Sequence, residues 1–250
     1  MDGKVLRYLH DRLARGPVHM TLIDPEKSPG ERAAEVAGAA VDLGSDAIML
    51  GGSTGISPER MGEAAKAVKR VVKVPTIIFP EGPGSLSSEA DAVYFMSLLN
   101  SRSLDFVIRS QARAAPYIRR LGLETIPLGY IVVAPGMRVG EVGQVDALAR
   151  DDLAGAEGYA LAAEFLGMRL VYLEAGSGAP EPVPPEMVRA VRAQLTIPLI
   201  VGGGIRSGRN AAALLGAGAQ LLVTGSVTEE QGVGAGFREI LREVRNARGD

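Results

Sequence analysis

The chain has 250 residues, of which 46% are hydrophobic and 22% are charged. This length suits one large domain or two small ones, and the apolar fraction is ample for a sizeable core. Lysine and arginine number 27 against 29 acidic residues, so the net charge is −2, and aromatic residues make up only 4%. A nucleic-acid-binding protein needs a basic face and stacking side chains, so that class is excluded.

The sequence contains no cysteine and only two histidines, His10 and His19. Disulfides, cysteine-bound zinc and thiol catalysis are therefore excluded, and a site with several histidine ligands is disfavoured. A bound metal should be a hard ion on oxygen ligands. No apolar run approaches the ~20 residues that span a membrane, and the N-terminus has no apolar signal region, so we expect a cytoplasmic protein.

Short apolar runs alternate with alanine-rich amphipathic stretches along the chain. The runs predict eight strands, which begin near Val18, Asp46, Pro75, Ala92, Thr125, Arg169, Pro198 and Gln220. Between most of these strands the sequence predicts helices over residues 31–43, 58–72, 102–121, 151–166, 185–195, 207–215 and 229–246. Strands that are apolar on both faces, such as residues 199–201, are typical of a parallel sheet covered by helices.

Eight strands that alternate with helices predict an α/β protein, a (β/α)8 TIM barrel with residues 1–250 as a single domain. A doubly wound open sheet is the alternative. Its dinucleotide-binding fingerprint should follow the first strand, but Ile23 is followed by Asp24 and Pro25 without a Gly-x-Gly-x-x-Gly motif. The connection from Phe79 to Ala92 is short for a crossover helix, so we expect the third βα unit to be degenerate.

Glycine-bearing loops follow the last two predicted strands, where barrels commonly bind phosphate. Gly203 and Gly204 lie in the first of these loops, and Gly225 and Ser226 lie in the second. Glycines allow backbone N–H groups to approach an anion closely. The alternative is that these glycines only make tight turns, but two such loops in the expected positions favour a phosphate site.

Asp24 and Ser53 follow the first and second predicted strands, so both should lie at the carboxyl end of the barrel. Mg²⁺ takes one or two protein oxygens together with substrate phosphate and water, and this pair would suit such an ion. An Asx-turn or helix cap made by Asp24, next to Pro25, is an equally good interpretation of that residue alone.

Glu174 ends the sixth predicted strand and could act as a general base on a hydroxyl group. Tyr172 and Ser177 could hold the same ligand. The alternative for Glu174 is an ion pair with an arginine such as Arg206. His19 lies inside the first strand, where we expect a core residue or one that supports the site from behind.

Taken together, these motifs resemble those of the geranylgeranylglyceryl phosphate synthase family, prenyltransferases that make the first ether bond of archaeal lipids. The matching stretches run in order through residues 19–27, 49–55, 95–101, 129–132, 172–178, 201–206 and 225–226. Many relatives carry a tryptophan in the loop after the fifth strand, whereas this chain has no tryptophan at all.

The resemblance implies a Mg²⁺-dependent transfer of a geranylgeranyl group from its diphosphate to the 3-hydroxyl of sn-glycerol 1-phosphate. Asp24 and Ser53 would bind the magnesium, and Glu174, with Tyr172, would act on the acceptor hydroxyl. The residues implied to bind the acceptor are Tyr172, Leu173, Glu174, Ala175, Gly176, Ser177 and Gly178, with Gly203, Gly204, Gly225 and Ser226 on its phosphate.

Several alternatives stay open at this point. A bacterial relative that uses a longer, heptaprenyl donor is the closest one. An unrelated phosphate-binding barrel enzyme, such as an isomerase or a protein like thiamine-phosphate synthase, is another, and a non-enzymatic phosphate-binding barrel is a third. The resemblance also implies a homo-oligomer, a dimer or a hexamer, and a lipid product implies transient contact with a membrane surface.

Overall fold

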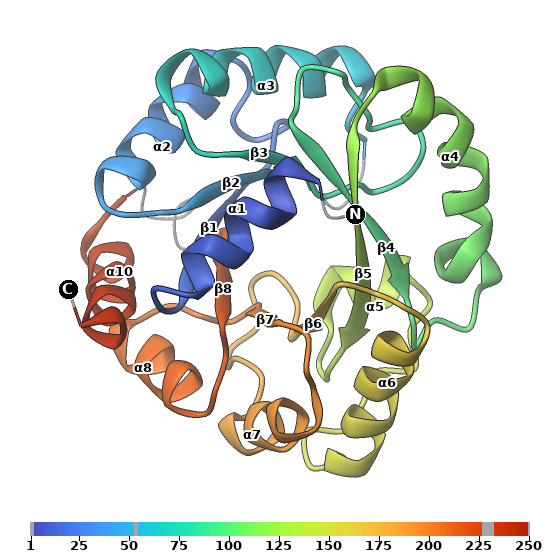
Figure 1. Ribbon diagram of the computed structural model, residues 1–250, viewed down its shortest axis with the longest axis vertical. Helices are drawn as coiled ribbons and strands as arrows, with labels where there is room; N and C mark the ends of the chain where they lie inside the picture. The colour runs from blue at the N-terminus through green and yellow to red at the C-terminus, as the bar shows by residue number, and fades with distance from the viewer. Residues whose placement is uncertain (1–2, 53–54, 227–232, 250) are drawn as a thin grey trace.

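The computed structural model describes residues 3–52, 55–226 and 233–249, and its eight parallel strands close into a barrel in sequential order (Figure 1). The strands are β1 (Val18–Ile23), β2 (Ala47–Leu50), β3 (Thr76–Ile78), β4 (Ala92–Leu98), β5 (Glu124–Val132), β6 (Leu170–Glu174), β7 (Leu199–Gly202) and β8 (Leu221–Thr224). The barrel closes where β1 pairs with β8, with Val18 opposite Leu221. The predicted (β/α)8 fold is confirmed, and each strand begins within one residue of its predicted start.

Helices surround the barrel, as Figure 1 shows. They are α2 (Glu31–Asp42), α3 (Pro58–Val71), α4 (Ser110–Leu121), α6 (Leu153–Phe165), α7 (Pro185–Gln194), α8 (Gly208–Gly216) and α10 (Ala235–Arg248). The helix predicted over residues 102–121 is in two parts, because a π-helix, η1 (Asp105–Arg109), precedes α4. A short helix that the sequence did not predict, α5 (Met137–Val142), follows β5. Residues 229–232 of the last predicted helix lie outside the described residues.

The third βα unit is degenerate, as predicted, since residues 79–91 contain no helix. Strand β3 pairs with β4 only at Ile77 opposite Ala92 and Ile78 opposite Val93. Strand β4 continues to Leu98, so its last five residues extend beyond the end of β3. This leaves one side of the barrel mouth without the strand and helix that cover it elsewhere.

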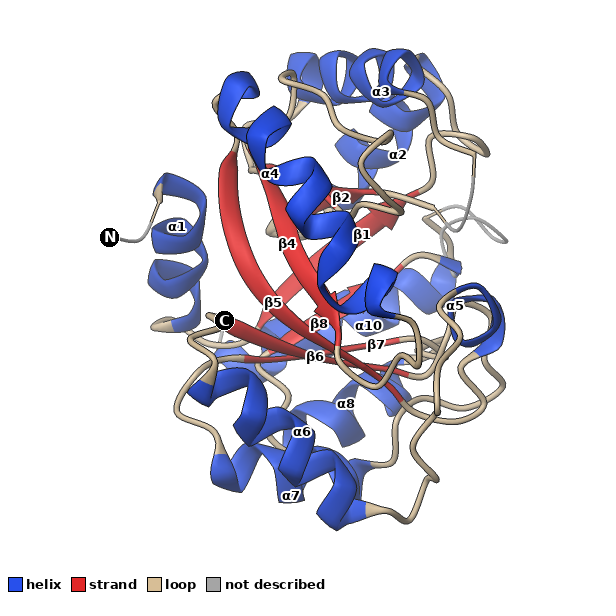
Figure 2. Cartoon of the chain, turned by 90° about the vertical axis from the view of Figure 1, so that its right-hand side faces the viewer, coloured by secondary structure: helices blue, strands red, loops and turns tan. Residues whose placement is uncertain are grey.

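Helix α1 (Lys4–Leu13) lies across the amino-terminal end of the barrel (Figures 1 and 2). Its apolar face packs Val5, Leu6 and Leu9 against the inward-facing side chains of the strands. The Glu124 carboxylate, at the start of β5, accepts hydrogen bonds from the N–H groups of Val5 (2.7 Å) and Leu6 (2.8 Å). Because this end is closed, access to the barrel interior is from the carboxyl ends of the strands.

A buried ion cluster ties both terminal helices to this closed end. Asp46, at the start of the β2 segment, is 3% exposed and forms ion pairs with Arg12 of α1 and Arg248 of α10. Its carboxylate also accepts a hydrogen bond from the His19 N–H at 2.9 Å. Two guanidinium groups therefore compensate the burial of one carboxylate.

Within the described residues, no helix combines the length and the apolar character needed to cross a lipid bilayer.

Candidate active site

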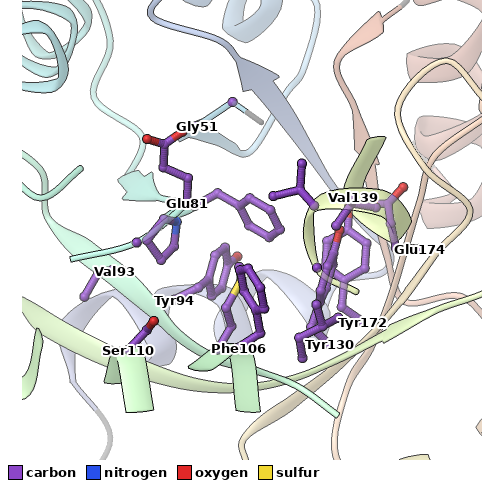
Figure 3. A pocket seen from close by; sticks show the side chains of 18 of the residues that line it. Gly51, Glu81, Val93, Tyr94, Phe106, Ser110, Tyr130, Val139, Tyr172 and Glu174 are labelled. Atoms are coloured by element: carbon purple, nitrogen blue, oxygen red, sulfur yellow. The ribbon is translucent and has the colours of Figure 1, made fainter. Parts of the chain in front are cut away.

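Two cavities adjoin at the carboxyl end of the barrel. The larger extends from the mouth into a groove between the loop after β3 and helix α4. Its outer part is mainly aliphatic and is lined by Leu86, Val93, Met96, Leu98, Phe106, Ala114, Ile118, Val139 and Val142. Figure 3 shows Val93, Phe106 and Ser110 on one side of this space and Val139, Tyr172 and Glu174 on the other. The degenerate third unit thus provides the room for an elongated apolar ligand.

The floor of the larger cavity is a cluster of aromatic rings inside the barrel. The Phe79 ring lies 5.4 Å from Tyr130, 6.0 Å from Tyr172 and 6.3 Å from Tyr94 between centroids, and Tyr130 lies 5.0 Å from Tyr172. These distances are typical of edge-to-face aromatic contacts. Four of the eleven phenylalanine and tyrosine residues of the chain therefore form this floor, beneath a largely aliphatic wall.

The smaller cavity lies at the ends of β6, β7 and β8 and is lined largely by glycines and hydroxyl groups. Gly178, Gly203, Gly204, Gly225 and Ser226 all border it. The Ser226 Oγ accepts a hydrogen bond from the Gly178 N–H at 3.1 Å and lies 2.9 Å from the Ser177 Oγ, so the loops after β6 and β8 are joined. This cavity has the backbone N–H groups and hydroxyls that a phosphate group requires.

Gly203 is required by the close approach of two strands at this point. Its φ is +79°, and a Cβ atom there would lie 2.3 Å from the Glu174 Oε1. Any larger residue would therefore displace the carboxylate. This position therefore requires glycine for backbone conformation and for space.

Glu174 stands where the two cavities meet, since it borders both of them together with Leu22, Tyr172 and Ser177. Its side chain is buried, and its Oε1 accepts a hydrogen bond from the Gly176 N–H at 2.7 Å. Burial raises the pKa of the Glu174 carboxyl, while hydrogen bonds from Gly176 and from the Tyr172 and Tyr130 hydroxyls act in the opposite direction. A carboxylate with a raised pKa and one face toward a cavity is well suited to accept a proton.

The two tyrosines beside Glu174 remain protonated. Burial, followed by the nearby Glu174 charge, raises the pKa of both Tyr172 and Tyr130 well above the ordinary value of 10. Protonated hydroxyls are hydrogen-bond donors, so these two groups stabilise the charged form of the Glu174 carboxylate. Tyr130 was not among the predicted site residues. Strand register places it opposite Tyr172. The one signal in the sequence was its place in the matching stretch at residues 129–132.

Asp24 lies in the wall of the larger cavity, in a tight turn after β1. Its Oδ1 accepts a hydrogen bond from the Glu26 N–H at 2.9 Å, which is the Asx-turn considered as the alternative. The carboxylate also lies against Gly52, where a Cβ atom would be 2.7 Å from it, and its Oδ2 is 4.0 Å from the Lys27 Nζ. The Asx-turn interpretation of Asp24 is therefore confirmed, and the residue also lines the larger cavity.

A metal ion bound by protein groups alone does not fit the described residues, because no three histidine, cysteine, aspartate or glutamate side chains among them gather around one point. An ion that arrives with a diphosphate fits better, because Mg²⁺ then needs only one or two protein oxygens. Asp24 can supply one. The second predicted ligand, Ser53, lies outside the described residues.

Three residues considered in the sequence analysis, Leu173, Ala175 and His19, lie outside the two cavities. The side chains of Leu173 and Ala175 alternate away from the barrel interior and pack in the core between the sheet and its helices. Only their backbone can contribute to a site, because successive residues of a strand point to opposite faces. The His19 ring is fully buried on that outer face, between the Ser45 hydroxyl (3.1 Å) and the Thr224 hydroxyl (3.0 Å). The expectation that it is a core residue holds.

Comparisons with known proteins found similar sequences and similar structures. A family model described as the PcrB family matches residues 10–247. The geranylgeranylglyceryl phosphate synthase of Thermococcus kodakarensis is 46% identical over 97% of this chain and 96% of its own length. The (S)-3-O-geranylgeranylglyceryl phosphate synthase of Thermoplasma acidophilum, solved in complex with sn-glycerol-1-phosphate, is 44% identical with a TM-score of 0.94 over 98% of this chain and 99% of its own.

A more distant structure, the thiamine phosphate pyrophosphorylase of Pyrococcus furiosus, has a TM-score of 0.58 at 18% identity, over 94% of this chain and 98% of its own. That likeness concerns the barrel fold alone. The identity to the prenyltransferases is much higher, so the alternative of a protein like thiamine-phosphate synthase is disfavoured.

Proposed function

The chain belongs to the PcrB family, and from this premise we propose that it transfers a geranylgeranyl group from geranylgeranyl diphosphate to the 3-hydroxyl of sn-glycerol 1-phosphate. The reaction forms the first ether bond of a membrane lipid. One observation carries the proposal: a glycine-lined polar cavity and a long apolar groove meet at the buried carboxylate of Glu174. A phosphorylated acceptor and a prenyl donor would have their reacting ends at that junction.

The acceptor would occupy the smaller cavity. Its phosphate would be held by the loops that carry Gly203, Gly204, Gly225 and Ser226, and Ser177 would lie beside its glycerol part. The hydroxyl to be alkylated would then face Glu174. Because the solved relative from Thermoplasma acidophilum is a complex with sn-glycerol-1-phosphate, this acceptor is the one to test first.

Glu174 would accept the hydroxyl proton as the new C–O bond forms. The Tyr172 and Tyr130 hydroxyls would keep the carboxylate oriented toward the acceptor. Holding the hydroxyl close to the allylic carbon contributes by proximity, and the apolar wall of the groove would keep water from the reacting carbon.

Asp24 would bind the Mg²⁺ ion together with Ser53, and Lys27 lines the same part of the groove. When bound, the ion neutralises the charge that develops on the departing diphosphate. Asp24 would hold the diphosphate end of the donor through the bound cation, since the carboxylate and the diphosphate are both anionic, while the prenyl tail extends toward α4.

We further propose that the whole chain is one prenyltransferase domain, that it works in the cytoplasm as a homo-oligomer, and that it contacts a membrane surface transiently. The single closed barrel supports the first point. An amphiphilic donor and a lipid product support the contact with a membrane surface.

The deciding experiment incubates the protein with Mg²⁺, sn-glycerol 1-phosphate and prenyl diphosphates of increasing length. We expect an ether-linked prenylglyceryl phosphate, with the geranylgeranyl donor used most efficiently. Preference for a longer donor would shift the assignment toward heptaprenyl transfer, and no ether product from any donor would contradict the proposal.

The role of Asp24 is tested by a substitution. The Asp24→Asn variant should require a much higher Mg²⁺ concentration than the wild type for half-maximal rate, with an unchanged circular dichroism spectrum.

A further inference from the structure

The segment between β5 and α6 forms one wall of the larger cavity, here called the donor groove because the prenyl donor would occupy it. The segment also contacts the loop after β6, here called the acceptor loop. It carries α5 along the mouth side of the barrel, opposite α1 (Figure 2). Arg138, Val139 and Val142 of α5 line the groove. The segment is attached to the rest of the barrel at its two ends.

The first attachment is to the loop after β6. The Gly136 N–H donates to the Ala175 carbonyl at 3.1 Å. Gly176 has a φ of +101°, and a Cβ atom there would lie 2.6 Å from the Gly136 carbonyl oxygen. The start of the segment is therefore packed directly on the loop that holds Glu174.

The second attachment is made by Asn100 and Ser101, which follow β4 after Leu99 and which we call the β4 clasp. Asn100 is 3% exposed, and its Nδ2 donates to the carbonyls of Val132 (2.8 Å) and Asp146 (2.9 Å). Its Oδ1 accepts from the Val132 N–H at 3.1 Å. One buried side chain thus joins the end of β5 to the far end of the segment, 46 residues away in the sequence.

Ser101 completes the clasp. Its hydroxyl donates to the Gly143 carbonyl at 2.6 Å, immediately after α5. The main chain adds two bonds, from the Arg102 N–H to the Gln144 carbonyl (3.0 Å) and from the Asp146 N–H to the Asn100 carbonyl (2.9 Å). The end of α5 is therefore held by both side chains and backbone.

Backbone strain indicates that these attachments are needed. Met137 and Gln144, at the two ends of α5, have φ values of +48° and +49° although neither is glycine. Such conformations are unfavourable for residues with a Cβ and persist only where the surroundings fix them. The loop after β6 fixes the backbone near Met137. The β4 clasp holds Gly143 and Asp146, on either side of Gln144, and the Arg102 N–H bonds to Gln144 itself.

We propose that Asn100 and Ser101 are positioning residues for prenyl transfer. They hold α5 as a fixed wall of the groove and so set the affinity for the prenyl diphosphate, without touching either substrate. The inference rests on the proposed function. It gives a role to the stretch at residues 95–101, which belongs to the family resemblance but supplies only Met96 and Leu98 to the cavity wall.

The test uses Ser101→Ala and Asn100→Asp, with the concentration of each substrate varied in turn. Each net hydrogen bond is worth roughly a factor of five in an equilibrium constant, and Asn100→Asp removes two donors. We expect the KM for geranylgeranyl diphosphate to rise about fivefold in Ser101→Ala and about tenfold or more in Asn100→Asp, with the KM for sn-glycerol 1-phosphate within about twofold. Ser101→Thr, which keeps the hydroxyl, should restore the donor KM, and Ser88→Ala, at an exposed serine, is the control.

Hydrogen exchange of the peptide over residues 137–145 gives a readout that does not depend on activity. We expect faster exchange in Ser101→Ala than in the wild type and no change in Ser88→Ala. Unaltered exchange, an unaltered donor KM, or an equal rise of both KM values would overturn the inference. An inactive wild-type protein would refute the proposed function, whereas an active one with unaltered variants refutes the clasp alone. If Asn100→Asp does not fold, Ser101→Ala decides the matter.

Discussion

Glu174 is a buried carboxylate at the meeting point of two cavities, where it accepts a hydrogen bond from the Gly176 N–H and is stabilised by the Tyr172 and Tyr130 hydroxyls. If it is the base, Glu174→Gln should lower kcat by about 100- to 10,000-fold, because the amide keeps the shape but takes up no proton. The KM for sn-glycerol 1-phosphate should change little. Glu181→Gln is the matched control, since Glu181 is an exposed glutamate near the mouth that pairs with Arg150. Comparable rates for both variants would remove Glu174 from the reaction.

His19 predicts a specific dependence of stability on pH. Burial, followed by the Arg248 charge, lowers the pKa of His19 from 6.5 to about 3 in the folded protein. As the pH falls below 6.5, His19 becomes protonated in the unfolded chain but stays neutral in the folded chain. The free energy of unfolding therefore decreases progressively between pH 6.5 and about 3. Between pH 7 and pH 5 this loss amounts to about 2 kcal/mol.

Urea denaturation at both pH values measures the effect. Between pH 7 and pH 5, the free energy of unfolding should decrease by about 2 kcal/mol less in His19→Gln than in the wild type. This difference does not depend on the absolute stability of the variant. His10→Gln, at the other histidine of the chain, is the control. An equal pH dependence in wild type and His19→Gln would show that another group is responsible.

Among the secondary-structure elements, α1 has a cap that its own sequence does not supply. Its N-cap residue is Gly3, whose lack of a side chain is compensated by Glu124 from β5. Glu124→Ala should lower the free energy of unfolding by about 1 to 2 kcal/mol, because two helix N–H groups lose an anionic acceptor. Glu63→Ala, at an exposed position in α3, should change it by less than about 0.5 kcal/mol. Equal effects of the two substitutions on the urea midpoint would mean that the cap contributes nothing.

For the whole molecule, we predict that the chain forms a homo-oligomer. Phe165 and Leu166 are adjacent at the end of α6, and they are 79% and 73% exposed. Two adjacent exposed apolar side chains are typical of an interface residue pair seen in a single chain. Light scattering should give two or six times the chain mass of 26.1 kDa. Phe165→Ser with Leu166→Ser should lower that mass, whereas Val71→Ser, at a single exposed valine, should not. A mass of one chain at micromolar concentration would contradict the prediction.

The sequence by itself determined the barrel fold and placed the candidate site at the carboxyl ends of the strands. Hydrophobic periodicity and turn residues are local, so the eight strand starts were predictable to within one residue, and parallel strands place the residues after them at one mouth. It also determined Glu174, Asp24 and the glycine loops as candidates. The short connection after β3 was enough to predict the degenerate unit.

Only the tertiary structure decided which of these groups meet. Strand register placed Tyr130 beside Tyr172 and Glu174, and strand alternation turned Leu173 and Ala175 into the core. The groove toward α4, the Glu124 cap and the β4 clasp all depend on pairs far apart in the chain, such as the 119 residues between Val5 and Glu124. Sequence patterns report the period of one element, whereas contacts of this kind arise only when closure of the barrel fixes the elements relative to one another.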